Sequence, residues 1–354
     1  MARDRARRWF AFWQAGIYLE GACTRIGHLF NDKAFFPTEL PVLLAPMAGI
    51  TDLPFRRLVS RFGAGLVVSE MVASQEMVQA KPGVRERAEL GFGSANTAVQ
   101  LAGRDPYWMA EAARMVEGNG ARIIDINMGC PAKKVVGGLS GSALLRDLDH
   151  ALRLIEAVVQ AVRVPVTLKT RLGWDDQIIT APELARRAEA AGIQMIAIHG
   201  RTRCQFYKGR ADWQAIRAVK RSVDIPVIAN GDIVDLATAR AALEASHADG
   251  VMVGRGIQGR PWLLAAIGAG LSGGAAPVVP RGVDFADMVA EHYEDTLAFY
   301  GAALGGRVIR KHLGWYMDQA ETPLGLRREV LTVADPARVL SLLRPALSRQ
   351  AVAA

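Results

Sequence analysis

The chain has 354 residues, of which 51% are hydrophobic and 22% are charged, and its formal net charge is +8. This length suits one large domain and a smaller one, and no apolar run approaches the roughly 18 residues of a membrane span, which excludes a membrane protein. The cysteines, Cys23, Cys130 and Cys204, are too few for a disulfide framework and favour a reducing compartment, so we expect a cytoplasmic protein. The positive charge permits a polyanionic partner.

Residues 1–40 differ from the rest of the chain. They mix arginines with tryptophans and phenylalanines and keep no clear period, so we expect a poorly ordered N-terminal extension. From residue 41 onward, apolar runs of strand length recur. They lie at residues 42–45, 65–69, 98–101, 123–126, 164–168, 195–198, 226–229 and 250–253.

Segments with helical periodicity separate most of these runs. They lie at residues 54–62, 106–117, 142–162, 181–191, 213–221 and 236–245, and the connection at 72–96 has the weakest pattern. Continuous apolar strands that alternate with helices are typical of parallel strands buried on both faces. Eight such units favour an α/β fold of the (β/α)8 TIM-barrel type over an open sheet, and we assign it to residues 41–268.

The remainder of the chain predicts a second, smaller domain. Residues 269–283 include a stretch rich in glycine, alanine and proline and predict a linker. Residues 284–350 predict a small helical bundle, with helices at 285–300, 307–319, 325–331 and 336–347. Basic residues of this bundle lie among Trp315 and Tyr316, a combination that suits RNA binding as well as it suits a solvated helix face.

Polar or glycine-rich groups stand at the C-terminal end of every predicted strand. They are residues 46–49, Glu70, Gln100, Asn127, Cys130, Lys169, Arg171, His199, residues 230–232 and residues 254–256. In a barrel these ends meet at one mouth, where barrel active sites are built. The loops after the last two strands commonly bind phosphate, and glycine lets backbone amides approach its oxygens.

Phosphate loops on one side and Gln100, Lys169 and His199 on the other outline a site for a flat cofactor with a phosphate tail. FMN fits, because a lysine beside the pyrimidine end of a flavin stabilises the reduced, anionic ring. Pyridoxal phosphate with Lys169 as the imine, or a sugar-phosphate substrate, would need the same loops. Neither explains Cys130 in a long loop, and no metal site is predicted.

The loop after the fourth strand is unusually long, from about residue 127 to residue 141. It carries Cys130 beside Asn127, and two cations, Lys133 and Lys134, that favour a thiolate. A lone cysteine is as often a small buried hydrophobe as a reactive group. The position of Cys130 at a strand end favours chemistry.

Seven motifs occur in a fixed order along the chain. They are LAPMAGITD at residues 44–52, QLAG at 100–103, DINMGCPAKKV at 125–135, LKTRLGW at 168–174, IHGRT at 198–202, NGD at 230–232 and GRG at 254–256. In this order they resemble the bacterial tRNA-dihydrouridine synthases, most closely the B-type subgroup, from about residue 42 to about residue 345. The resemblance implies an FMN-bearing barrel followed by a helical domain that binds tRNA.

The resemblance also implies the reaction and its residues. NADPH or NADH would reduce FMN, flavin N5 would deliver hydride to C6 of a uridine in tRNA, and Cys130 would protonate C5. General acid catalysis of this kind gives ~10²–10⁴-fold, and the base must first leave the folded RNA. The residues implied to hold FMN are Pro46, Met47, Ala48, Gln100, Lys169, His199, Asn230, Gly231, Asp232, Gly254 and Arg255.

Candidate tRNA contacts are Asn127 and the basic side chains of the mouth loops and of the bundle. They are Asn127, Lys133, Lys134, Arg171, Arg203, Lys208, Arg210, Arg307, Arg310 and Lys311. We expect a monomer without an obligate protein partner. A flavin enzyme that reduces a free pyrimidine, similar to dihydroorotate dehydrogenase, is an alternative, but it would not need the basic tail. An RNA-binding protein without turnover would not need Gln100, Cys130, Lys169 and His199 together.

Overall fold

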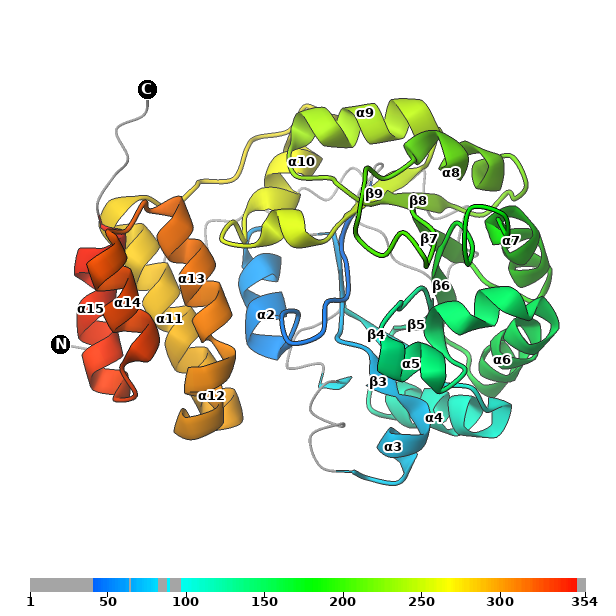
Figure 1. Ribbon diagram of the computed structural model, residues 1–354, viewed down its shortest axis with the longest axis horizontal. Coiled ribbons are helices and arrows are strands. Elements are labelled where there is room, and N and C mark those ends of the chain that lie inside the picture. The colour runs from blue at the N-terminus through cyan, green and yellow to red at the C-terminus, as the bar shows by residue number, and fades with distance from the viewer. Residues whose placement is uncertain (1–40, 64, 82–87, 90–96, 349–354) are drawn as a thin grey trace.

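A computed structural model of the protein describes residues 41–63, 65–81, 88–89 and 97–348. The predicted N-terminal extension, residues 1–40, and part of the connection at 72–96 lie outside the described residues. The chain forms a large α/β unit with a helical bundle beside it, and one connection joins the two (Figure 1).

Eight parallel strands form a closed ring, which confirms the predicted TIM barrel. They are β1 (Val42–Leu44), β2 (Leu66–Val68), β4 (Thr97–Ala102), β5 (Ile123–Met128), β6 (Val166–Arg171), β7 (Met195–His199), β8 (Val227–Asn230) and β9 (Gly250–Val253). Neighbours pair in the order β2-β1-β9-β8-β7-β6-β5-β4, and Val67 of β2 lies opposite Thr97 of β4 to close the ring. Every residue of these strands is buried except Lys169, which is half-buried.

Strand β6 begins and ends later than predicted, and its later end changes the position of two functional side chains. β6 begins at Val166 and not at residue 164, because Pro165 has no amide hydrogen for the ladder, and it continues to Arg171. Lys169 and Arg171 therefore lie within the strand and not after it. The short strand β3 (Val72–Ala73) and helix α3 (Ser74–Val78) were not predicted, and β3 pairs with β4 beyond the end of β2.

Helices cover the outside of the ring. They are α2 (Leu53–Arg61), α4 (Pro106–Gly118), α6 (Leu148–Ala161), α7 (Ala181–Ala190), α8 (Trp213–Lys220), α9 (Leu236–Ser246) and α10 (Leu263–Ser272). Five of these helices begin after an aspartate whose carboxylate accepts a hydrogen bond from a backbone amide of the first turn. The N-caps are Asp52, Asp105, Asp147, Asp212 and Asp235. These aspartates mark helix starts in the sequence, although the start after Asp147 was not predicted.

The long loop after β5 is more ordered than predicted. It contains helix α5 (Lys133–Gly137) and the 3₁₀ helix η2 (Gly141–Arg146). The single helix predicted over residues 142–162 is wrong, because Asp147 separates η2 from α6. Its carboxylate accepts a hydrogen bond from the His150 amide at 2.9 Å, which starts a new helix.

The helical bundle comprises α11 (Gly282–Tyr300), α12 (Ala302–Val308), α13 (Arg310–Gln319), α14 (Leu324–Thr332) and α15 (Pro336–Leu347). The predicted linker is too long at both ends. Residues 269–272 continue α10, whose Leu263, Leu264 and Ile267 pack into the core around β1 and β9, and α11 begins at Gly282. The helix predicted at 307–319 is also divided, at the buried residue Ile309.

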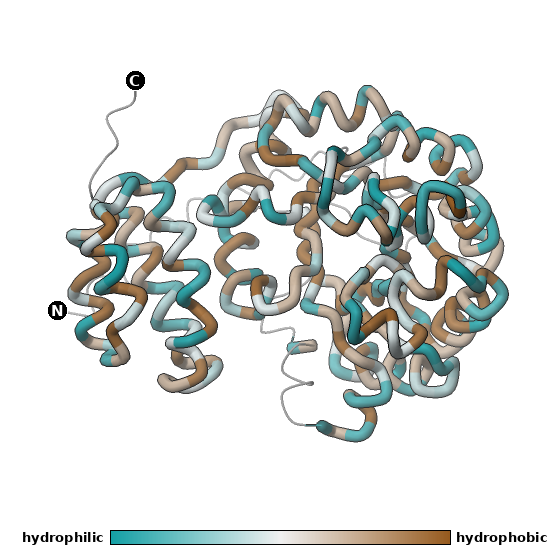
Figure 2. Tube along the Cα trace, viewed as in Figure 1, coloured by the Kyte–Doolittle hydropathy of each residue, from teal (hydrophilic) through white to brown (hydrophobic). Residues whose placement is uncertain are grey.

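The bundle packs against the barrel through α2, which faces it in Figure 1. Leu58 of α2 joins the apolar core of the bundle, and the Phe55 ring lies 4.6 Å, centre to centre, from the ring of His312. Lys311 of α13 donates a hydrogen bond to the Gly49 carbonyl at 2.9 Å. Figure 2 shows hydrophobic and hydrophilic residues alternating along the helices of both parts, as expected for amphipathic helices with one face toward a core and the other toward water.

Candidate active site

A cavity of about 870 Å³ opens at the C-terminal ends of the barrel strands. Every residue predicted to hold a cofactor lines it: Pro46, Met47, Ala48, Gln100, Lys169, His199, Asn230, Gly231, Asp232, Gly254 and Arg255. Cys130, Asn127 and Arg171 line it too. Parallel strands bring these residues together because all their C-terminal ends lie at the same rim. The helical bundle adds Trp315, Asp318 and Gln319, of which the sequence had indicated only Trp315, as a residue suited to RNA binding.

A buried carboxyl group, Asp125, lies beneath the cavity. One of its oxygens accepts a hydrogen bond from Gln100 Nε2 at 2.7 Å, and the other accepts one from the Thr167 hydroxyl at 2.6 Å. Burial raises the pKa of Asp125, and the two hydrogen bonds and the Lys169 charge oppose that rise. The sequence did not mark Asp125 as a site residue, because an acid inside an apolar strand gives no hint of its partners.

The hydrogen bonds continue from Asp125 to the loop that carries Cys130. Gln100 turns its amide nitrogen toward Asp125, so its oxygen accepts from Asn127 Nδ2 at 2.8 Å. Asn127 Oδ1 then accepts from the backbone amides of Cys130, at 3.0 Å, and Gly129, at 3.2 Å. Asp125 therefore sets the orientation of the Gln100 amide, and Gln100 sets that of the Asn127 amide. Asn127, predicted as a tRNA contact, therefore also positions the start of the Cys130 loop.

Lys169 places a cation at the floor of the cavity. Its ammonium group donates to Asn230 Oδ1 at 3.1 Å, and Asn230 Nδ2 donates to the Met252 carbonyl at 2.8 Å. Burial, together with the nearby charge of Arg171, lowers the pKa of Lys169 to about 8, although Asp125 and Cys130 favour the charged form. Lys169 is therefore mostly protonated at neutral pH.

Arg201 also lines the cavity, and it was not predicted as a site residue. It is 1% exposed, and it donates to Asp232 Oδ2 at 2.7 Å and to the carbonyls of Gly209, at 2.7 Å, and Lys208, at 3.1 Å. Burial opposes the charge on Asp232, but the hydrogen bonds from Arg201 and from the Ala211 amide prevail and lower its pKa. A signal was present in the sequence, because Arg201 belongs to the quoted IHGRT motif.

His199 lies beside this arginine, with its Nε2 3.2 Å from Arg201 Nη1. Burial lowers the pKa of His199 well below its usual range, and the surrounding cations, first Lys169 and Arg171, lower it further. The imidazole is therefore neutral at physiological pH and can donate or accept one hydrogen bond in the cavity.

The loops after β8 and β9 place two glycines and a cation at the cavity. Gly231 has φ +114°, and a Cβ there would lie 2.8 Å from the Ala211 Cβ, so only glycine fits. A Cβ on Gly254 would meet nothing closer than the Ala45 Cβ at 3.8 Å, so its backbone borders open space. Arg255 has a largely exposed guanidinium, 4.0 Å from Asp232 and 5.0 Å from the centre of the Tyr207 ring. These backbone amides and this cation can hold an anionic group.

The prediction that Arg171 meets the RNA backbone is corrected by its position. It is 2% exposed, and its guanidinium donates to the carbonyls of Gly129, at 2.8 Å, Thr202, at 3.0 Å, and Phe206, at 2.8 Å. These bonds tie the Cys130 loop to the loop after β7. The side chain borders the cavity and lies beside Tyr207, with its guanidinium carbon 5.5 Å from the centre of that ring, so it faces the interior of the cavity and not the solvent.

The other basic candidates lie outside the main cavity. Lys133, Lys134, Lys208 and Arg210 are exposed on the mouth loops. Lys311 is exposed and donates a hydrogen bond to the Gly49 carbonyl at the domain boundary, and its role as an RNA contact stays a prediction.

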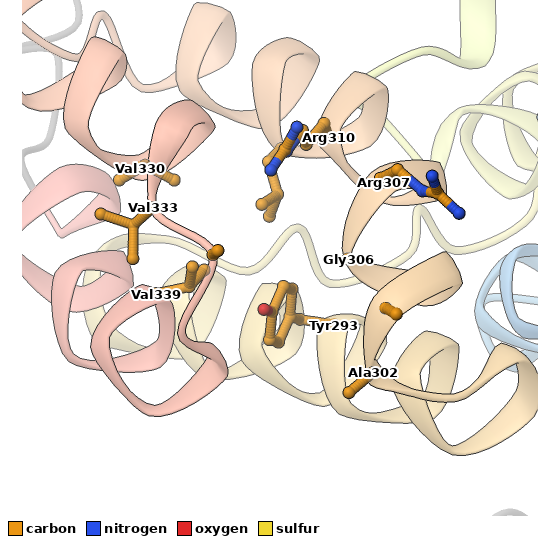
Figure 3. A pocket seen from close by; sticks show the side chains of 11 residues that line it. Tyr293, Ala302, Gly306, Arg307, Arg310, Val330, Val333 and Val339 are labelled. Carbon is orange, nitrogen blue, oxygen red and sulfur yellow. The ribbon is translucent and has the colours of Figure 1, made fainter.

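Arg307 and Arg310 line a separate cavity of about 360 Å³ in the bundle. In Figure 3 the Tyr293 ring and the Arg310 side chain lie on opposite sides of it.

No group of three or more His, Cys, Asp or Glu side chains in the described part of the chain is placed to hold a metal ion. Among the helices of that same part, none is both long and apolar enough to cross a membrane.

Comparison with known proteins identifies the family. The family model described as "Dihydrouridine synthase (Dus)" matches residues 43–352. The chain belongs to this family. The resemblance seen in the sequence motifs is thereby confirmed, and the match decides against the alternative similar to dihydroorotate dehydrogenase.

Relatives agree with this assignment, and a solved structure shares the fold. A probable tRNA-dihydrouridine synthase of Rhodobacter capsulatus is 63% identical over 314 residues, which cover 88% of this chain and 96% of that relative. A tRNA-dihydrouridine synthase B of Vibrio cholerae is 48% identical over 288 residues, 81% of this chain and 89% of the relative. Histamine dehydrogenase from Rhizobium sp. 4-9 matches with a TM-score of 0.52 at 13% identity, over 77% of this chain and 50% of that one, and so shares the fold alone.

Proposed function

We propose that this protein reduces specific uridines of tRNA to 5,6-dihydrouridine, using FMN that is itself reduced by NADPH or NADH. Membership of the dihydrouridine synthase family and the names of relatives up to 63% identical support the reaction class and the substrate. The observation that carries the proposal is the placement of Cys130. It borders the cavity, and hydrogen bonds through Asn127 and Gln100 connect its backbone to the buried Asp125.

The residues of the cavity fit FMN. Gly254 and Arg255 offer backbone amides and a guanidinium to the phosphate, while Gln100, Lys169 and the neutral His199 offer donors to the polar edge of the ring. Bound FMN would supply the hydride that adds to C6 of uracil. Lys169 stabilises negative charge on the ring by direct attraction, since it keeps its proton at neutral pH.

Cys130 has the role of proton donor. Addition at C6 leaves an enolate-like ring, and the Cys130 thiol passes its proton to C5. Asn127 fixes the backbone at the start of the loop and so sets where the sulfur can lie. Arg171 Nη2 donates to no carbonyl of the described residues and is the candidate donor to a uracil carbonyl.

The substrate base must reach these groups from outside. The cavity of about 870 Å³ lies in the range of pockets that hold cofactor-sized ligands, and a base extruded from folded RNA enters such a pocket from its open side. The exposed cations Lys133, Lys134, Lys208 and Arg210 flank that opening and would attract the RNA backbone. We also propose that the protein works as a monomer in the cytoplasm, which size-exclusion chromatography and cell fractionation test.

The decisive experiment incubates the FMN-saturated protein anaerobically with NADPH and a tRNA transcript that lacks modifications. Mass spectrometry of the digested RNA should show a gain of two hydrogens on defined uridines. A protein that binds FMN and oxidises NADPH but leaves the transcript unchanged would contradict the proposal. Turnover of orotate or free uridine at a higher rate than tRNA would contradict it as well.

A further inference from the structure

Three loops meet around Trp174 at the rim of the barrel. Trp174 follows β6, Arg203 follows β7, and Arg146 ends η2 in the loop after β5. The guanidinium carbons of Arg146 and Arg203 each lie 4.8 Å from the centre of the Trp174 ring. One indole therefore packs against two guanidinium groups, an arrangement that cation–π attraction stabilises.

Neither guanidinium is neutralised. Among the described residues, neither Arg146 nor Arg203 forms an ion pair, and Arg203 Nε is buried without a hydrogen-bond partner. The adjacent carboxylates are engaged elsewhere. Asp175 accepts from the backbone amide of Ile178 at 2.9 Å, and Asp176 faces the Thr202 hydroxyl at 3.5 Å. Among the described residues, the two guanidinium groups therefore have no ion-pair partner of their own.

The backbone holds this cluster in place. The Arg203 amide donates to the Gly173 carbonyl at 2.9 Å, and the Cys204 amide donates to the Trp174 carbonyl at 2.9 Å. The loops after β6 and β7 are thus joined on both sides of the indole. An exposed lysine loses side-chain conformational entropy when it binds a phosphate. A guanidinium group that is already packed on a ring loses less.

We infer that Trp174, Arg146 and Arg203 form a preorganised site for phosphodiester groups of the RNA strand that brings the uridine to the cavity. This inference rests on the proposed function and adds a second RNA contact to it. Figure 1 shows β5, β6 and β7 on the side of the barrel away from α11–α15, so the site lies across the mouth from the bundle. RNA held there and at the bundle would span the cavity.

The test measures tRNA affinity of the FMN-saturated protein by fluorescence anisotropy at several salt concentrations. Arg146→Ala with Arg203→Ala should weaken binding roughly tenfold and reduce the slope of log affinity against log salt by about 2, one for each phosphate that is no longer neutralised. Trp174→Leu keeps both charges, so it should weaken binding about fivefold without a change of slope, because only their arrangement is disturbed. Arg217→Ala with Arg221→Ala on the outer side of α8 removes equal charge and should have little effect.

Each result has a defined meaning. Wild-type affinity and slope in the Arg146/Arg203 variant would overturn the site, provided that the wild-type protein binds tRNA. Wild-type affinity in Trp174→Leu, with flavin content and melting temperature showing a folded protein, would overturn the role of the indole. An equal loss in the Arg217/Arg221 control would reduce the effect to net charge and also overturn the inference. If the wild-type protein neither binds nor modifies tRNA, the proposed function fails and this inference fails with it.

Discussion

The barrel mouth and the helical bundle both contain many charged residues, but they place them differently. At the mouth, Asp125, Arg171 and Arg201 are buried, and each is held by several hydrogen bonds. In the bundle, the core is mostly apolar but includes the buried polar side chains of His292, Thr296 and His312, and the ionised groups form exposed pairs such as Arg344 with Asp287 at 3.0 Å. Burial of an ionisable group shifts the pKa of that group, whereas exposed ion pairs contribute little to stability.

The difference teaches where substitutions should matter. Removing one partner of a buried polar group leaves the other without water or a hydrogen bond, which costs ~1–3 kcal/mol or more. Removing one partner of an exposed pair leaves a solvated charge. We therefore expect effects on chemistry and stability to concentrate in the mouth, and effects in the bundle to appear mainly as changes in RNA affinity.

The largest expected effect is that of Cys130→Ala. Loss of the proton donor should slow dihydrouridine formation by ~10²–10⁴-fold, while FMN binding and the reduction of FMN by NADPH stay unchanged, since neither step uses the thiol. Anaerobic rapid mixing with pre-reduced protein and tRNA separates the steps. Dihydrouridine formed at the wild-type rate by this variant would mean that Cys130 has only a structural role.

A second prediction concerns the buried carboxyl beneath the cavity. Asp125→Leu removes the acceptor for Gln100 and Thr167 and should lower the free energy of unfolding by about 1–3 kcal/mol for each unpaired group. It should also slow uridine reduction by up to ~10²-fold, because Gln100 and then Asn127 lose the group that orients them. Denaturant unfolding and single-turnover rates measure the two effects.

The control for this prediction is Asp125→Asn. Its side-chain oxygen can still accept from Gln100, and its amide can donate to the Thr167 oxygen, so the chain to Cys130 survives. Most of the activity should return. Equal losses of activity in the Asn and Leu variants would show that orientation of Gln100 is not what Asp125 provides.

A third prediction uses pH. The pKa of Lys169 is lowered to about 8, mainly by burial, and a bound anionic cofactor would favour its charged form. Affinity for FMN should therefore be constant well below pH 8 and fall as pH rises through about 8, because the free protein then loses the cation. Lys169→Met should bind FMN more weakly, with no such pH dependence. Parallel pH profiles for the two proteins would contradict this assignment.

The same pKa fixes the sign of the effect on stability without cofactor. Unfolded chains keep the lysine proton up to about 10.5, whereas the folded protein releases it near 8, so the unfolded state binds more protons between these values. The contribution of Lys169 is therefore unfavourable below pH 8, and it improves as pH rises through this window.

The smallest expected effect lies in the bundle. Arg344→Ala breaks the exposed pair with Asp287 and should change the free energy of unfolding by only ~0.2–1 kcal/mol. A double-mutant cycle with Asp287→Ala measures the coupling. A coupling as large as that expected at Asp125 would remove the contrast between the two regions.

Much of this arrangement was readable from the sequence. Apolar runs located the eight strands because parallel strands are buried on both faces, and convergence of their ends then grouped Gln100, Cys130, Lys169 and His199. What could not be read were partners distant in the chain. Arg201 was passed over because its partner Asp232 is 31 residues away. Arg171 was taken as exposed because the carbonyls that bury it belong to two other loops.

Three short elements were not predicted, for a different reason. β3 has two residues, α5 has five and η2 has six, too few for a period to show. Lys311 was assigned to RNA because a lysine on a basic helix gives no sign that a barrel loop lies within reach. The domain contact that it makes depends on tertiary packing alone.

Gly49 forms hydrogen bonds with both parts of the molecule. Its amide donates to the Glu70 carboxylate of the barrel, and its carbonyl accepts from Lys311 of the bundle. Its φ of +71° favours glycine, and a Cβ there would lie 2.7 Å from Lys311 Nζ, so the end of the lysine side chain would have to move. The same loop supplies Pro46, Met47 and Ala48 to the cavity wall. A rotation of the bundle about residues 273–281 would therefore either break the hydrogen bond between Lys311 and Gly49 or move the cavity wall with it.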